Sequence, residues 1–342
     1  SSLIIRFLLA STFIPAIPTF IFAQNFVSTY AGTGTSGLDN GDTATCTFKA
    51  PFGMCSDNAG NIFIADQDNN CIRKITPSGI VSTYAGTGTA GYADGLSSLA
   101  QFKGPIDVCS DDSGNIYVSD FTNQYIRKIS FDGLVSTIAG NGVAGYVDGA
   151  ASSAEFNYPR GICRDQQGNL YIGDSWNHRI RKISADGQVS TYAGGGNIFG
   201  VQSVSEFKDG PDTTARFYTP CGLSIDATGN IFVADAYNHR VRKIDLNRVV
   251  TTVAGSGASG SAAGGFADGD TSIARFNTPT ELFVNAAGEI FVGDTYNQRV
   301  RLVNEGTLCE HRRLHKGVQA SSSQSSAAPS SSGARMARTR AW

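Results

Sequence analysis

The chain has 342 residues, of which 41% are hydrophobic and 16% charged, and it contains 40 glycines. This composition excludes a largely disordered chain and favours many turns over long helices. Residues 24–304 hold 20 Lys and Arg against 27 Asp and Glu. The acidic balance argues against nucleic acid as the main partner, because phosphate binding needs a basic surface.

The first 23 residues are predicted to be a signal peptide. Residues 3–22 are apolar apart from Arg6 and a few hydroxyl side chains, and Pro15 and Pro18 interrupt them. The run after Arg6 is short for a membrane span of about 20 residues, so cleavage after Ala23 is favoured over a membrane anchor. We therefore expect a secreted or periplasmic protein with no stable membrane insertion after cleavage.

Two segments then recur along the chain. GNIFIADQDNNCIRKI, or a variant of it, begins at Gly60, Gly114, Gly168, Gly229 and Gly288. VSTYAG, or a variant of it, begins at Val27, Val81, Val135, Val189 and Val250. Five copies at a nearly constant period predict stacked equivalent units within residues 24–304.

Each unit is predicted to contain four short strands, which in the first unit span residues 52–56, 62–66, 71–75 and 81–86. The Gly, Asn, Asp and Ser turns between them are short enough to require antiparallel hairpins. Both faces of such a sheet carry apolar residues, so repetition around an axis would bury both. The predicted fold is an all-β propeller of four-stranded antiparallel blades. A solenoid is the alternative, but it would leave its ends uncovered.

The connections between units begin with glycine-rich turns. G-x-G-x-x-G occurs four times, for example at Gly86, Gly88 and Gly91, but a dinucleotide site needs these glycines to open a helix. Turn sequence follows instead, so sharp turns are predicted. The connections, 18 to 25 residues long, each carry a phenylalanine expected to anchor the loop between blades: Phe48, Phe102, Phe156, Phe217 and Phe276. We expect these loops and the short D-x-x-N turns to share one face of the ring.

The repeated pattern resembles the NHL repeat, with the best agreement at Pro159, Gly161 and residues 168–183. The resemblance covers about residues 24–304 and departs from the pattern at Asp107, Gln124, Tyr125, Glu281 and Glu289. It implies a β-propeller, in a family that includes extracellular sensor domains, protein- and RNA-binding modules and a few lyases, so the fold does not define the activity. NHL-type lyases are expected to use several histidines around the channel, whereas this region has only His178 and His239.

The order of the strands predicts how the ring closes. The repeat region begins with a VSTYAG segment at residues 27–32 that has no preceding partner strands, and the last unit lacks its VSTYAG strand. Pairing residues 27–32 with the last unit would close a ring of five blades and remove two exposed edges. The alternative is a six-bladed parent that has lost one blade, because NHL propellers commonly have six.

One repeated aspartate is expected to be architectural. It is predicted to accept hydrogen bonds from its own turn or to pair with the arginine seven residues later. The positions are Asp66, Asp120, Asp174, Asp235 and Asp294. Calcium at these carboxylates remains an alternative, although the spacing is not that of an EF-hand. No other cofactor and no metal-binding residue is predicted.

Positions at which the units differ are the predicted ligand-binding residues. Asp107, Arg160 and Glu281 lie just after the proline that opens a blade, where charged groups would converge on the mouth of the channel. Trp176, Tyr237 and Tyr296 lie inside D-x-x-N turns, where three aromatic rings would share one sector of the face.

The cysteines are expected to contribute to packing, and the C-terminus differs in composition from the repeats. Cys55, Cys109 and Cys163 share one strand position and are expected to be small buried side chains, while pairing of Cys46 with Cys71 or Cys221 stays open. Residues 305–342, rich in Ser, Ala and Arg, are expected to be disordered.

Two functions are consistent with these patterns. The favoured one is a non-catalytic propeller that binds a protein, peptide or glycan on its long-loop face. The alternative is a metal-assisted lyase or lactonase-like enzyme at the channel mouth, although no serine or cysteine has a nearby base and no catalytic residue is predicted. The sequence does not define an oligomeric state.

Overall fold

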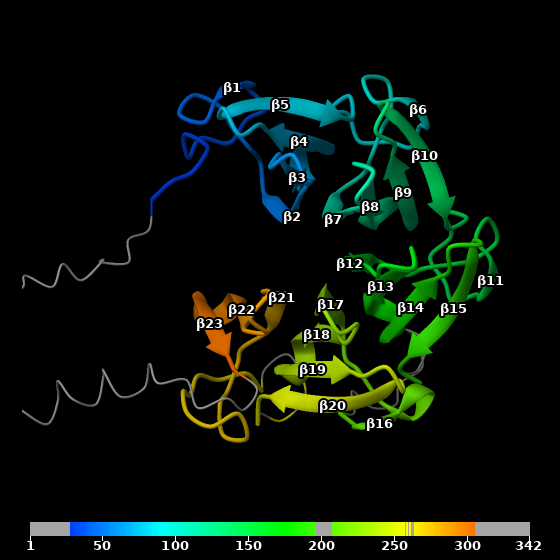
Figure 1. The fold of residues 1–342 in the computed structure, drawn as a ribbon, viewed down its shortest axis with the longest axis vertical. Helices are drawn as coiled ribbons and strands as arrows, with labels where there is room; N and C mark the ends of the chain where they lie inside the picture. Colours follow the sequence, from blue (N-terminus) through cyan, green and yellow to red (C-terminus); the bar gives the residue numbers. More distant parts are fainter. Residues whose placement is uncertain (1–27, 196–206, 257, 259, 261–262, 305–342) are drawn as a thin grey trace, which may run out of the picture.

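The computed structural model describes residues 28–195, 207–256, 258, 260 and 263–304. These residues form five antiparallel sheets arranged around a central axis, as predicted (Figure 1). The predicted signal peptide and C-terminal tail lie outside the described residues. Within those residues the only helices are short 3-10 turns, so no helix follows the glycine-rich motifs.

The first three sheets share one strand order from the outer edge toward the axis. The first sheet contains β1 (Gly41–Asp42), β5 (Ile80–Ala85), β4 (Cys71–Ile75), β3 (Ile62–Asp66) and β2 (Pro51–Ser56). The second contains β6 (Gly95–Leu96), β10 (Leu134–Ala139), β9 (Tyr125–Ile129), β8 (Ile116–Asp120) and β7 (Pro105–Ser110). The third contains β11 (Gly149–Ala150), β15 (Gln188–Ala193), β14 (Arg179–Ile183), β13 (Leu170–Asp174) and β12 (Pro159–Arg164).

The fourth and fifth sheets differ in size. In the same order, the fourth contains β16 (Gly210–Pro211), β20 (Val249–Ala254), β19 (Arg240–Ile244), β18 (Ile231–Asp235) and β17 (Pro220–Ile225). The fifth contains only β23 (Arg299–Val303), β22 (Ile290–Asp294) and β21 (Pro279–Val284). Short 3-10 turns are η1 (Gln67–Asn69), η2 (Phe121–Asn123), η3 (Ser175–Asn177), η4 (Asp212–Thr214), η5 (Ala236–Asn238) and η6 (Thr295–Asn297).

The long connections do more than link the blades. Each of the first four connections adds a two-residue strand to the outer edge of the sheet that follows it in the chain. These sheets therefore have five strands rather than the four predicted. The glycine that follows each outer strand has a positive φ, as at Gly86 with 105°, a conformation that glycine adopts at little cost. This confirms the prediction that the G-x-G-x-x-G glycines turn the chain out of the blade.

The blades pack face to face, and the loop phenylalanines lie between them. Phe156 is fully buried among Ile126 and Ala139 of the second sheet and Ile162 and Leu170 of the third. Phe102 lies in the same way between the first and second sheets. The prediction that these rings anchor loops between blades is confirmed for Phe102, Phe156, Phe217 and Phe276. It was wrong for Phe48, which is only half-buried and packs against the first blade alone, since no blade precedes it among the described residues.

The repeated aspartates are architectural. In every unit the aspartate accepts hydrogen bonds from a backbone amide of the preceding loop and from the asparagine three residues later. It also pairs with the arginine on the next strand, which is fully buried in the first four units. These ion pairs are Arg73–Asp66, Arg127–Asp120, Arg181–Asp174, Arg242–Asp235 and Arg301–Asp294, at 2.6–3.0 Å. Both oxygens of each carboxylate are thus already engaged by N–H donors.

In the first four blades, the residue after the D-x-x-N turn joins its blade to the next one. This residue has a positive φ. Its side chain accepts a hydrogen bond from the backbone N–H of the residue that precedes the proline of the following blade. The pairs are Gly104 to Asn70, Tyr158 to Gln124, Thr219 to His178 and Thr278 to His239, at 2.6–3.1 Å. The two histidines of the repeat region are therefore inter-blade acceptors. Burial, followed by the neighbouring Arg179, lowers the pKa of His178 to about 4, so its ring is neutral.

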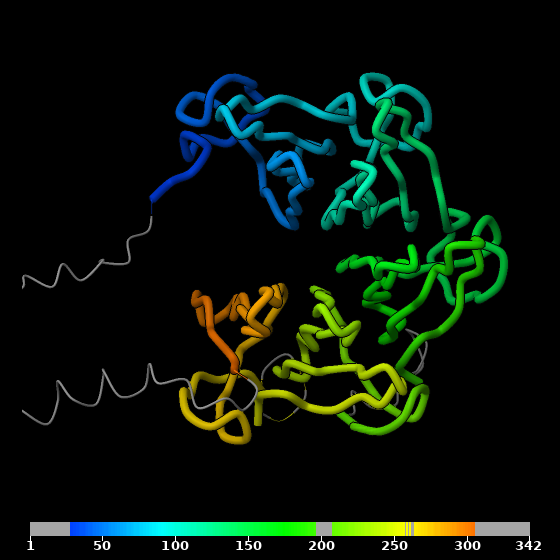
Figure 2. Tube along the Cα trace, viewed as in Figure 1, coloured from blue at the N-terminus to red at the C-terminus, as the bar shows by residue number. Residues whose placement is uncertain are grey.

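The predicted closure by residues 27–32 was wrong for the described part of that segment. Residues 28–32 form no strand, and β23 has no partner on its outer side within the described residues. Gly32 and Thr33 donate hydrogen bonds to Thr43 and Cys46, which hold the segment beside the first blade. Figure 2 shows the first and last sheets separated by an opening in the ring.

The exposure of the last blade agrees with this open arrangement. Val300 is 76% exposed, whereas its counterparts Ile72, Ile126, Ile180 and Val241 are fully buried. Each of those four residues packs against a following blade, which the fifth sheet lacks. The six-bladed alternative would provide such a neighbour, but the described residues contain five sheets.

Candidate ligand-binding site

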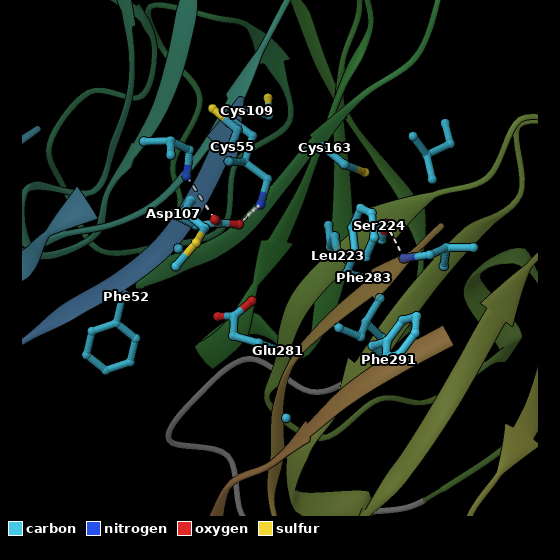
Figure 3. A pocket seen from close by; sticks show the side chains of 18 of the residues that line it. Phe52, Cys55, Asp107, Cys109, Cys163, Leu223, Ser224, Glu281, Phe283 and Phe291 are labelled. Atoms are coloured by element: carbon cyan, nitrogen blue, oxygen red, sulfur yellow. Dashed lines mark hydrogen bonds between the residues drawn. The ribbon is translucent and has the colours of Figure 1, made fainter. Parts of the chain in front are cut away.

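The inner strands of all five sheets line a central cavity of about 540 Å³ (Figure 3). One position, the third residue of each inner strand, is occupied by Gly53, Asp107, Gly161, Gly222 and Glu281. Because each inner strand begins beside the D-x-x-N turn, this position lies toward that end of the cavity. The cavity therefore has two acidic side chains near one end, and Cys55, Cys109 and Cys163 lie two residues further along their strands.

Asp107 is held by backbone amides of two blades. Its Oδ1 accepts a hydrogen bond from Val108 at 2.8 Å, and its Oδ2 accepts one from Ile162 at 2.9 Å. A Cβ atom on Gly53 would lie 1.9 Å from Oδ1. The absence of a side chain at position 53 is therefore what allows Asp107 to lie across the neighbouring inner strand.

Glu281 likewise lies over a glycine of the preceding blade, Gly222, but it makes no hydrogen bond among the described residues. A Cβ atom on Gly222 would lie 2.6 Å from its Oε2. Figure 3 shows this carboxyl group directed into the cavity, and among the described residues no donor is within hydrogen-bonding distance of it. Each acid thus lies over a glycine of the preceding blade, but only Asp107 has partners.

The electrostatics of the two acids are linked. Burial raises the pKa of Asp107 to about 7, although its amide donors and Arg160 oppose the shift. Burial, followed by the nearby Asp107, raises the pKa of Glu281 well above its ordinary value, and Arg160 again opposes the shift. Both groups therefore favour the protonated form more strongly in the folded protein than in water.

Arg160 connects the cavity to the turn face, the surface formed by the D-x-x-N turns and the long loops. Its charge acts on both Asp107 and Glu281, and its guanidinium carbon lies 5.8 Å from the centre of the Phe121 ring. Its Nε atom is buried without a hydrogen-bond partner. The structure thus brings the three predicted charged residues together.

The predicted aromatic residues fall into separate groups on the turn face. Trp176, 37% exposed, lies 4.2 Å from Tyr158, which in turn lies 4.8 Å from Phe121. Tyr237 is half-buried and lies 5.1 Å from Tyr218. These distances join ring centres. Two of the three predicted rings therefore belong to larger clusters.

Tyr296 is different, because it is 64% exposed and has no ring neighbour among the described residues. Sequence reasoning missed Phe121, Tyr158 and Tyr218. The available signal was position: Tyr158 directly precedes a blade-opening proline, and Phe121 directly follows a repeated aspartate. Both positions belong to the turn face.

Comparison with known proteins identifies the repeat. The model of the NHL repeat matches residues 156–183 and 217–244. The chain is 29% identical to Protein SUPPRESSOR OF QUENCHING 1, chloroplastic, of Arabidopsis thaliana, over 84% of this chain and 28% of that protein. It is 28% identical to NHL repeat-containing protein 2 of Homo sapiens, over 78% of this chain and 40% of that protein. The chain is an NHL-repeat β-propeller.

Solved structures resemble this NHL propeller in fold. An auxiliary nutrient binding protein from Bacteroides thetaiotaomicron VPI-5482 superposes with a TM-score of 0.50 and 17% identity, covering 81% of this chain and 75% of that one. A chain of a nidogen/laminin complex gives the same TM-score and identity, covering 78% of this chain and 83% of that one. The NHL propeller spans less than half the length of the plant and human relatives it matches.

Other features of the NHL propeller bear on the remaining hypotheses. The cysteines in the described part of the chain, including Cys46, Cys71 and Cys221, are free thiols. Within the same residues, no three His, Cys, Asp or Glu side chains are placed to hold a metal ion together. The helices within the described residues are all too short to cross a membrane.

Proposed function

We infer that this NHL propeller is a non-catalytic binding module that takes up an extended ligand, a peptide or a glycan chain, on its turn face. The observation that carries this inference is the partly exposed ring group of Trp176, Tyr158 and Phe121, on turns held rigidly by the buried Asp–Arg pairs. Aromatic rings on a rigid scaffold provide contact area at little cost in conformational entropy. Binding residues are commonly found on such loops.

The ligand would extend across neighbouring blades. Tyr237 and Tyr218 form the next ring group on the turn face, and Tyr296 lies one blade further on. A ligand contacting Trp176 and Tyr237 would therefore lie along the third and fourth blades. The auxiliary nutrient binding protein of similar fold from Bacteroides thetaiotaomicron VPI-5482 is consistent with a binding role. The composition of residues 3–22 supports a secreted or periplasmic location for such a module, which also remains a proposal.

The test compares two variants on arrays of peptides and glycans. Replacing Trp176, Tyr237 and Tyr296 together with alanine should reduce binding to the selected ligands at least tenfold, because the ring contacts are lost. The matched control replaces Phe131 and Leu246, exposed apolar residues of turns on the opposite face, 79% and 69% exposed. Equal binding by the aromatic variant and the wild type would refute the proposed face, as would an equal loss in the control.

A further inference from the structure

We propose that the central cavity is a second binding site, specific for a monovalent organic cation: a protonated amine attached to an apolar body. The site is distinct from the turn face, and its occupant is a small molecule. Its volume of about 540 Å³ falls within the range of about 300–1,000 Å³ typical of small-molecule sites.

The charges around the acid pair favour a cation. In the cation-bound state, with Asp107 and Glu281 ionised and Arg160 protonated, these three side chains would carry one net negative charge. A single ammonium group would neutralise it and would donate hydrogen bonds to Glu281, whose carboxyl group has no donor among the described residues.

The other described groups near the two acids do not supply the positive charge that would neutralise them. Facing them are Arg160 from β12, Cys221 from β17 and the thiols of Cys55, Cys109 and Cys163. Burial raises the pKa of every one of these thiols, so they stay protonated and neutral near pH 7. Arg164 also lines the cavity, but its side chain extends away toward Gly168. Its Nη2 atom lies 3.4 Å from the position that a Cβ atom on Gly168 would occupy.

The rest of the lining suits the apolar body of such a ligand. Phe52, Phe283 and Phe291 contribute aromatic rings, and Leu223 and Val108 contribute aliphatic surface. In Figure 3, Phe52 lies on one side of Glu281, while Phe283 and Phe291 lie on the other. Aromatic faces attract cations as well as apolar groups, so the lining supports both parts of the ligand.

The test uses 4-phenylbutylamine and its neutral analogue 4-phenylbutanol in isothermal titration calorimetry with the full chain. The amine should bind at least tenfold more tightly than the alcohol. Glu281→Gln should weaken amine binding at least tenfold, since the amide cannot ionise. The same substitution at Glu289, which accepts a hydrogen bond from Asn285 in a turn of the same sheet, should leave the dissociation constant unchanged.

Proton release provides a measurement that a purely structural role would not affect. The pKa of Glu281 is raised in the folded protein, and a bound ammonium group beside the carboxyl group would lower it again by favouring the ionised form. Amine binding should therefore release a proton, seen as an enthalpy that depends on the buffer, and the affinity should increase as the pH rises. This measurement needs only the wild type, so it remains valid if Glu281→Gln fails to fold.

Three results would overturn the proposal. They are no detectable amine binding, equal affinity for the amine and the alcohol, and amine binding that neither Glu281→Gln nor pH affects. None of them would alter the aromatic test of the turn face, so the two sites can fail independently.

Discussion

Replacing Arg181 with alanine is expected to lower the free energy of unfolding by about 3–5 kcal/mol, the usual cost of removing one partner of a buried ion pair. The guanidinium group is fully buried and contacts Asp174 at 2.7 Å and Asp148 at 2.6 Å. It also donates to the carbonyl groups of Val147 and Glu155. Its loss would leave the carboxylate of Asp174 charged and buried without its cation.

The pH dependence of this variant follows from Asp174. Burial raises the pKa of Asp174, and Arg181 is the strongest influence lowering it. Without Arg181 the pKa rises further, so the folded variant binds a proton that the unfolded chain releases. Its deficit in stability should therefore be larger at pH 8 than at pH 5, as measured by urea denaturation.

Arg301→Ala is the matched control, because it removes the same contact from the incomplete fifth blade. Arg301 pairs with Asp294 at 2.8 Å, but its other partner, Asp268, is 76% exposed. We expect a smaller loss there, because Arg301 is itself 9% exposed and Asp268 is in contact with water, although Asp294 is buried. Equal losses for Arg181→Ala and Arg301→Ala, or a loss below about 1 kcal/mol for Arg181→Ala, would contradict the structural role of the buried pair.

Phe156→Ala is expected to cost about 3–5 kcal/mol, the range for removing a buried aromatic ring. Phe156 is fully buried between two blades, so its loss leaves a cavity at an interface rather than at a surface. Its ring also lies 5.1 Å from the guanidinium carbon of Arg181. The effects of Phe156→Ala and Arg181→Ala should therefore be non-additive in a double-mutant cycle.

Phe48→Ala provides the comparison for the loop phenylalanines. Phe48 occupies the equivalent loop position but is only half-buried, and it packs against the core of the first blade alone. We expect less than half of the loss seen for Phe156→Ala, measured by the same denaturation. A larger loss at Phe48 would show that the inter-blade position is not what stabilises the loops.

The sequence predicted the parts of the fold that depend on one unit. The hairpins, the Asp–Arg pairs and the loop phenylalanines recur in every copy, so each was visible as a repeated pattern. The closure of the ring was not predictable in this way, because it depends on the angles summed over all the blades. The two-residue edge strands were also missed, since Gly41 and Asp42 pair only through a loop that has no strand pattern of its own.

The candidate site was predictable only in part, for a related reason. Asp107 and Glu281 stood out because they replace a repeated glycine. Their placement depends on Gly53 and Gly222 in the preceding blades, and no pattern within one unit shows that contact. The aromatic clusters likewise combine Trp176 with Tyr158 from the preceding loop.

Hydrogen exchange tests the proposed turn-face function most directly. The chain would be compared alone and with the peptide or glycan that binds most tightly on the arrays. Binding at the turn face should slow the exchange of amides in residues 121–124, 175–178 and 236–239, while the turns at 57–60, 111–114 and 165–168 on the opposite face keep their rates. Protection confined to those opposite turns would contradict the account.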